Sequence, residues 1–156
     1  MPTLDDVYRK FGEAAEAAQL LETELGTMLL IECATEANLI AVPNPVLATE
    51  LYNTINRHTL GQLLNRLHKS TQTLDELAAL LSNALRERNR LSHSFYRHHN
   101  FRRNSEEGRI IMLQDLEALH GTLLSAYKAV MLLSGVDLDA LAAAGEHNGP
   151  IRRVPI

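Results

Sequence analysis

The chain has 156 residues, of which 46% are hydrophobic and 22% are charged, and its formal net charge is −4. This composition fits one soluble globular domain with a real core, and it excludes a protein that coats nucleic acid in bulk, which needs a basic domain. The single cysteine, Cys33, excludes an intrachain disulfide and indicates a reducing compartment, which we expect to be the cytoplasm.

The first predicted helix begins after Thr3, a suitable N-cap, with Asp5 and Asp6 at its positive end. Apolar residues then recur every three or four positions as far as about Ala41. Asp5 and Asp6 occupy positions at which a signal peptide would carry basic residues. No apolar run is long enough to span a membrane. We therefore expect neither a signal peptide nor a membrane anchor.

The second predicted helix begins at a proline-containing break in the chain. Asn44 is expected to be its N-cap and Pro45 its first helical residue, and the helix should run to about Arg57. The residues predicted to face inward are Val46, Leu47, Leu51 and Ile55. A short third helix should follow Gly61.

A capping box of Thr73 and Glu76 predicts the start of a fourth helix, which should end between Phe95 and His99. Its buried stripe is Leu74, Leu77, Leu81 and Ala84, and the same spacing continues to Arg88, Leu91 and Phe95.

Arg88 therefore occupies a position that faces the core. A guanidinium in such a place needs a carboxylate partner, a subunit interface or a cleft. Most acids of the first helix should lie on a solvated face. Glu32 and Glu36 lie among apolar residues, however, and either is a candidate to pair with Arg88 or with another arginine of the fourth helix.

The chain after the fourth helix is expected to form a polar loop over residues 100–108 and a fifth helix from Gln114 that ends near Gly135. Residues 109–113 fit either a short extended piece or the start of this helix. We expect an all-α fold, an up-and-down bundle of about five helices in one domain over residues 1–136. Residues 137–156 should form a short helix and a flexible tail.

Positive charge is concentrated at the end of the fourth helix. Six arginines and one glutamate give residues 86–103 a formal charge of +5, so the rest of the chain carries −9. Such a cluster attracts anions. Arg86, Arg90, His93 and Arg97, spaced four, three and four apart, should share one face. The adjacent His98 and His99 should point apart, so we expect no metal site there.

The segment Arg88-Asn89-x-x-x-His93 resembles the Arg-x(4–6)-His motif of the HEPN superfamily (higher eukaryotes and prokaryotes nucleotide-binding). This family consists of small all-helical domains, and many of its members are metal-independent ribonucleases of toxin–antitoxin, phage-defence and RNA-processing systems. The resemblance covers the helical layout over about residues 1–135, but only residues 86–96 carry the motif.

The resemblance implies an endoribonuclease without cofactor, with a composite site between two copies of the chain. Arg88 would stabilise the phosphate, His93 would transfer protons and Asn89 would orient one of them. Arg86, Arg90, Arg97, Arg102 and Arg103 would bind RNA, and Tyr96 and Glu36 would support the site. A cognate antitoxin protein would be a further partner.

Geometry agrees with a composite site, because Arg88 and His93 lie about 140° apart on an ideal helix. One HEPN toxin subgroup is modified on a tyrosine two residues after the histidine, where this chain has Phe95, so regulation there is not expected. Two other interpretations stay open. One is a catalytically inactive HEPN-like dimer that acts as a regulatory or protein- or nucleotide-binding module, and the other is an unrelated helical interaction protein.

Overall fold

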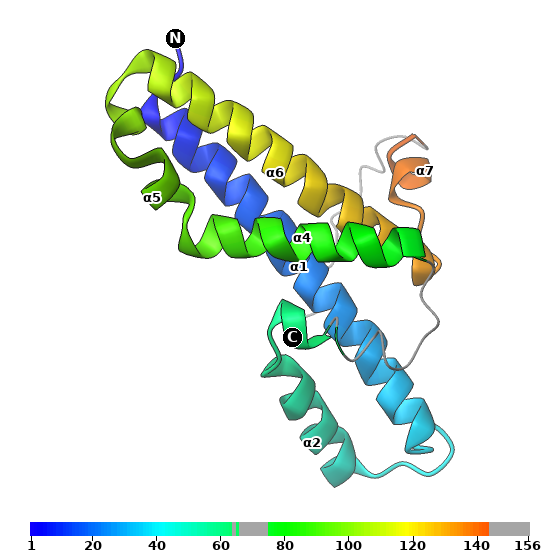
Figure 1. Ribbon diagram of the computed structural model, residues 1–156. Helices are drawn as coiled ribbons and strands as arrows, with labels where there is room; N and C mark the ends of the chain where they lie inside the picture. The colour runs from blue at the N-terminus through cyan, green and yellow to red at the C-terminus, as the bar shows by residue number, and fades with distance from the viewer. Residues whose placement is uncertain (64, 66–74, 144–156) are drawn as a thin grey trace.

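The computed structural model describes residues 1–63, 65 and 75–143, and every regular element within these residues is helical. The elements are α1 (Leu4–Glu36), α2 (Pro45–Asn56), α4 (Asp75–His93), α5 (Phe95–His99), the 3₁₀ helix η1 (Asn100–Asn104), α6 (Glu106–Leu133) and α7 (Leu138–Ala143) (Figure 1). The predicted all-α bundle is confirmed. Thr73 of the expected capping box and the expected tail from residue 144 lie outside the described residues. None of the described helices is both long and apolar enough to cross a membrane.

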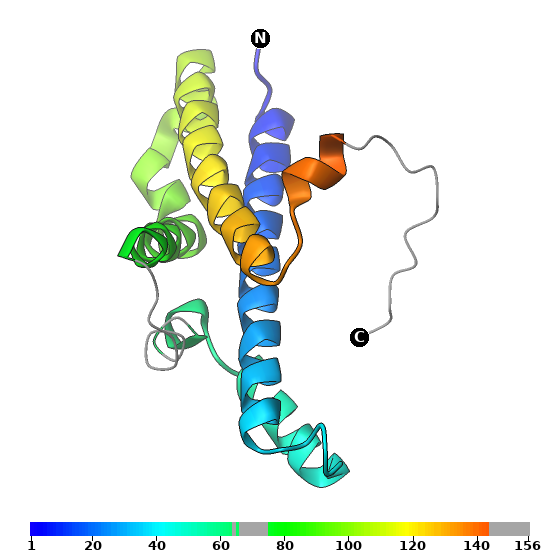
Figure 2. The same ribbon diagram turned by 90° about the vertical axis from the view of Figure 1, so that its right-hand side faces the viewer.

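Helices α1 and α6 form the core of the bundle and run side by side in the same direction (Figures 1 and 2). Arg109 Nε donates to the Pro2 carbonyl at one end (2.8 Å), and Ser134 Oγ donates to Glu24 Oε1 at the other (2.6 Å). The pair is parallel because α4, α5 and η1 carry the chain back to the N-terminal end of α1 before α6 begins. Its buried residues are Val7, Ala14, Ala17, Ala18, Leu21 and Leu25 of α1 and Met112, Leu116, Leu119, Leu123, Ala126 and Val130 of α6.

Helix α4 crosses this pair, and α2 packs against the C-terminal half of α1 (Figure 1). The predicted stripe of α4 is correct as far as the structure describes it: Leu81, Ala84 and Leu91 are buried, as is Phe95 at the start of α5, and Leu77 is partly buried. Leu74, the first member of the stripe, lies outside the described residues. The stripe predicted for α2 is correct only in part. Ile55 is buried and Leu47 and Leu51 are partly buried, but Val46 is 70% exposed.

The helix ends follow local rules that are visible in the sequence. Thr3 and Asp6 form a capping box on α1, and the Asn44 side chain caps α2 with Pro45 in the first turn, as predicted. The predicted end of α1 near Ala41 is wrong. The helix ends at Glu36 because Asn38 adopts a left-handed conformation (φ 56°), with Leu39 N–H donating to the Ala34 carbonyl.

The predicted loop over residues 100–108 is also wrong. Its first half is η1, and α6 begins at Glu106, where Ser105 Oγ accepts from Gly108 N–H. Residues 109–113 are therefore helical. Gly108 permits this arrangement, because a Cβ there would lie 2.0 Å from the Arg102 carbonyl oxygen. At the other end, Gly135 (φ 85°) terminates α6 as predicted.

Candidate functional site

Arg88 reaches from α4 to α1, as its place in the buried stripe requires. Its side chain is 22% exposed, and Nη2 lies 2.8 Å from Glu22 Oε1. The expectation of a carboxylate partner is therefore correct, but pairing with Glu36 or Glu32 is not what the structure shows. Glu36 is exposed and follows Glu22 by 14 residues, or about 21 Å along the helix.

The pairing of Arg88 leaves the guanidinium only partly occupied. Glu22 Oε1 is buried yet makes no hydrogen bond, so the contact at 2.8 Å is an ion pair whose angle falls outside hydrogen-bond geometry. Nη1 of Arg88 donates to Asn89 Oδ1 at 3.1 Å. A guanidinium has five N–H donors, so donors remain for a further anion.

His93 lies on the opposite side of α4 from the buried stripe and is exposed. The exposed stripe of α4, here called the outer face, consists of Ala79, Ser82, Arg86, Asn89 and His93. Asn89 thus shares a face with His93 while it bonds to Arg88. Arg88 and His93 make no contact with each other in the described part of the chain, as their angular separation leads one to expect.

Arg90, which was grouped with Arg86 and His93, is less exposed than either of them and is held by two acids. Its Nη1 and Nη2 donate to the two carboxylate oxygens of Asp115 on α6 at 2.6 and 2.8 Å, and its Nε donates to Glu87 at 2.8 Å. Hydrogen bonding to Asp115 raises the pKa of Arg90 further above its usual value. Arg90 joins α4 to α6 and has little capacity left for RNA.

Asp115 also binds His99, which is 2% exposed. Nε2 of His99 lies 2.7 Å from Asp115 Oδ2, and its Nδ1 lies 3.1 Å from Arg102 Nη1. Arginine can only donate, so Nδ1 accepts from Arg102, and Nε2 carries the proton that is donated to Asp115. Hydrogen bonds from Arg90 and His99 hold the pKa of Asp115 below its usual value, against the opposing effect of its burial.

The residues around this network include three further arginines that were predicted to bind RNA. Arg97, Arg102 and Arg103 are exposed, and none of them contacts a carboxylate in the part of the chain that the structure describes. Tyr96 packs on Phe11 and Phe95. Burial raises the pKa of Tyr96, and the nearby Arg103 opposes that rise.

Arg86 is exposed and sits beside Asn83 and Glu87, 3.6 Å from the latter. Sequence reasoning missed Glu22, Asp115 and the buried role of His99. The only signal was the position of Arg88 in the buried stripe, which demands an acid somewhere. His98 and His99 do point apart as predicted, with His98 exposed.

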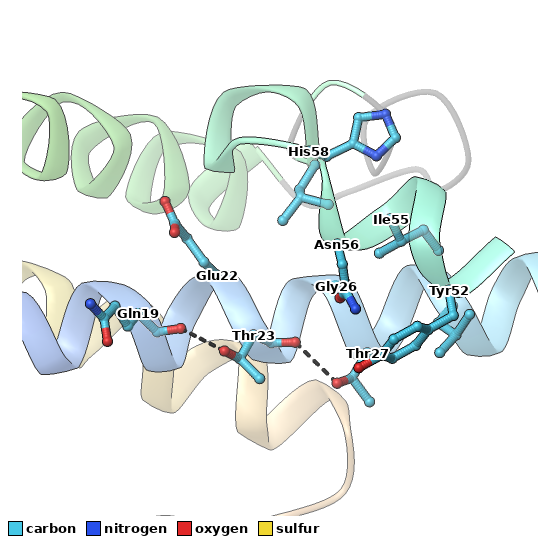
Figure 3. A pocket seen from close by; sticks show the side chains of 11 residues that line it. Gln19, Glu22, Thr23, Gly26, Thr27, Tyr52, Ile55, Asn56 and His58 are labelled. Carbon is cyan, nitrogen blue, oxygen red and sulfur yellow. Dashed lines mark hydrogen bonds between the residues drawn. The ribbon is translucent and has the colours of Figure 1, made fainter. Parts of the chain in front are cut away.

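Two hollows adjoin the Glu22–Arg88 pair. One, of about 450 Å³, lies between α1 and α2 and is lined by Gln19, Glu22, Thr23, Gly26, Tyr52 and Asn56 among others (Figure 3). The hydroxyl groups of Thr23 and Thr27 donate back to carbonyls of α1. The other, of about 320 Å³, is lined by Glu22, Arg88, Leu91 and Ser92 among others. Glu22 therefore lines both hollows, and Arg88 lines the second.

No three of the described His, Cys, Asp and Glu side chains come together as metal ligands. Comparison of the chain with models of protein families, with curated proteins and with solved structures found no match.

Proposed function

We propose that this protein is a metal-independent endoribonuclease of the HEPN type, which acts in the cytoplasm as a homodimer and serves as a toxin or defence component. One observation carries the proposal. His93 is open to solvent on the outer face of α4, and the adjacent Asn89 connects that face to the guanidinium of Arg88.

The chemistry needs only these groups. A base removes the proton of the RNA 2′-hydroxyl, the oxygen attacks the phosphorus, and the bond to the 5′-oxygen breaks as that oxygen receives a proton. An imidazole can accept and then return a proton near neutral pH, so His93 suits both steps. The guanidinium of Arg88 stabilises the additional negative charge on the phosphate.

The outer face of α4 also favours a second copy as the partner. Ala79 and Ser82 are small and Asn89 is uncharged, so two such helices can approach closely around a two-fold axis, with the exposed Arg86 left to bind the RNA phosphates. Each copy would then add its His93 to one shared cleft, in which a single imidazole serves first as the base and then as the acid. Arg88 itself faces α1, and its link to the outer face is Asn89, whose Oδ1 accepts from Arg88 Nη1.

Cleavage of end-labelled single-stranded RNA in excess EDTA tests this function. The wild-type protein should give products that end in a 2′,3′-cyclic phosphate. His93→Ala should abolish cleavage, and His98→Ala, an exposed histidine one turn away, should retain it. Loss of activity on chelation, or equal activity of the two variants, would contradict the proposal.

The Glu22–Arg88 ion pair favours a second candidate function, a non-catalytic HEPN-like dimer that binds a protein or a nucleotide, since a paired guanidinium is also a structural element. Expression in a bacterial host separates the two candidates. An active toxin should arrest growth, and His93→Ala should relieve the arrest at equal protein level. If both proteins are harmless, the binding module is the better account. A cognate antitoxin would be a partner only of the toxin.

A further inference from the structure

The turn η1 holds Phe101 in solvent. Its side chain is 76% exposed, more than any other aromatic side chain in the part of the chain described. A single exposed apolar residue is ordinary in proteins, so the setting of Phe101 has to decide its meaning.

That setting is a firmly held turn. The Arg102 carbonyl lies against Gly108 of α6, and Arg109 Nη1 donates to the Arg103 carbonyl at 3.1 Å. Asn100, which precedes Phe101, adopts φ 39° and ψ −115°, a conformation that suits glycine and costs free energy for other residues. The exposed position of Phe101 is therefore fixed by the contacts of the turn.

Charged residues follow Phe101 in the sequence. Arg102 and Arg103 follow it directly, and neither is neutralised by a carboxylate within the described residues. Glu106 and Glu107 occupy the first turn of α6, where they favour the helix dipole. Proteins that bind single-stranded nucleic acid combine aromatic side chains, on which bases stack, with basic groups that follow the backbone.

We propose that Phe101 is a stacking platform for an unpaired base of single-stranded RNA, whose adjoining phosphates bind Arg102 and Arg103. This inference rests on the proposed function, which makes single-stranded RNA the substrate. Only α5, which rises about 7 Å, separates His93 from η1, so a strand that passes His93 reaches Phe101 within a few nucleotides.

The absence of tryptophan from the chain allows a direct test. Phe101→Trp introduces the only indole, whose fluorescence a stacked base should quench. The Phe101→Trp protein, which also carries His93→Ala to prevent cleavage, is titrated with an unstructured oligouridine and, separately, with a blunt RNA duplex. Quenching by the single strand and not by the duplex is expected. Ile40→Trp, at an equally exposed position (76%) beyond the C-terminal end of α1, is the matched control and should not respond.

Affinity for the same oligonucleotide gives the second measurement. Phe101→Leu keeps an apolar side chain without a ring, and it should weaken binding about tenfold while Phe101→Tyr does not. Arg103→Ala should lower the salt slope of binding by about 0.7. An unquenched indole, or unchanged affinity in Phe101→Leu, would overturn the inference. Dissociation of the dimer by Phe101→Leu at unchanged RNA affinity would also overturn it and assign the ring to an interface between copies.

The outcome for stacking can be separated from the outcome for the nuclease. If the wild-type protein cleaves RNA in EDTA and Phe101→Trp shows no quenching, only the stacking site is wrong. If the indole is quenched and no cleavage occurs, the nuclease is wrong and the stacking site stands.

Discussion

Gly108 is expected to be the most sensitive of the glycines that the structure describes. In Gly108→Ala, the new methyl group would meet the carbonyl oxygen, carbonyl carbon and Cα of Arg102 at 2.0, 2.6 and 2.7 Å. These are backbone atoms, so no rotamer change relieves the clash. The turn η1 must retreat from α6 by at least about 1 Å to restore an ordinary separation.

Overpacking of this kind lowers the free energy of unfolding by about 3 kcal/mol. The higher helix propensity of alanine offsets up to about 1 kcal/mol of this, so the net loss of stability is about 2 kcal/mol. Gly121→Ala on the same helix is the matched control, because its Cβ would meet nothing within 4 Å. It should gain up to about 1 kcal/mol. The melting temperatures of the two variants, followed by circular dichroism, should then differ by about 9 °C.

Equal melting temperatures would refute this reasoning, as would a Gly108→Ala protein that is more stable than the wild type. Either result would mean that η1 does not lie against α6, and the placement of Arg102 and Phe101 would be wrong with it.

Two further predictions concern the ion pairs. Glu22→Gln removes the carboxylate that pairs with Arg88 and should strengthen the binding of single-stranded RNA roughly fivefold, or by about 1 kcal/mol. A fluorescence anisotropy titration measures this affinity. Unchanged binding would mean that Arg88 does not contact RNA. Asp115→Asn should cost about 2 kcal/mol in urea unfolding at pH 7, because Arg90 and His99 lose a charged acceptor. The pKa of Asp115 is lower in the folded protein than in the unfolded chain, so this stabilisation is present above about pH 4 and is lost as the pH falls through the folded-state pKa. The difference in unfolding free energy between wild type and variant should therefore narrow as the pH falls through that pKa, and a difference that does not narrow in acid would contradict the assignment.

Features determined by neighbouring residues could be predicted from the sequence. Thr3, Asn44 with Pro45, and Gly135 mark helix ends through local hydrogen bonds and backbone preferences, which do not depend on the rest of the fold. The buried stripe of α4 follows from periodicity alone, and so does the demand of Arg88 for an acid.

Features that depend on residues far apart in the sequence could not be predicted from it. Periodicity shows that Arg88 faces inward but not which helix it meets, so Glu22 stayed among the acids of a solvated face. The polar composition of residues 100–108 suggested a loop, yet contacts with Gly108 and Arg109 hold the first part of it as η1. Asp115 acquires its role only when α6 packs on α4 and α5.

The central claim, an active site shared between two copies of the chain, is tested most directly by combining two inactive variants in one dimer. Arg88→Ala and His93→Ala should each abolish RNA cleavage in EDTA as homodimers. When the two inactive proteins are unfolded together, refolded and assayed, mixed dimers hold one intact Arg88 and one intact His93. Cleavage should return, well above that of either parent refolded alone. A mixture that contains mixed dimers and stays inactive would contradict a site shared between two copies of the chain.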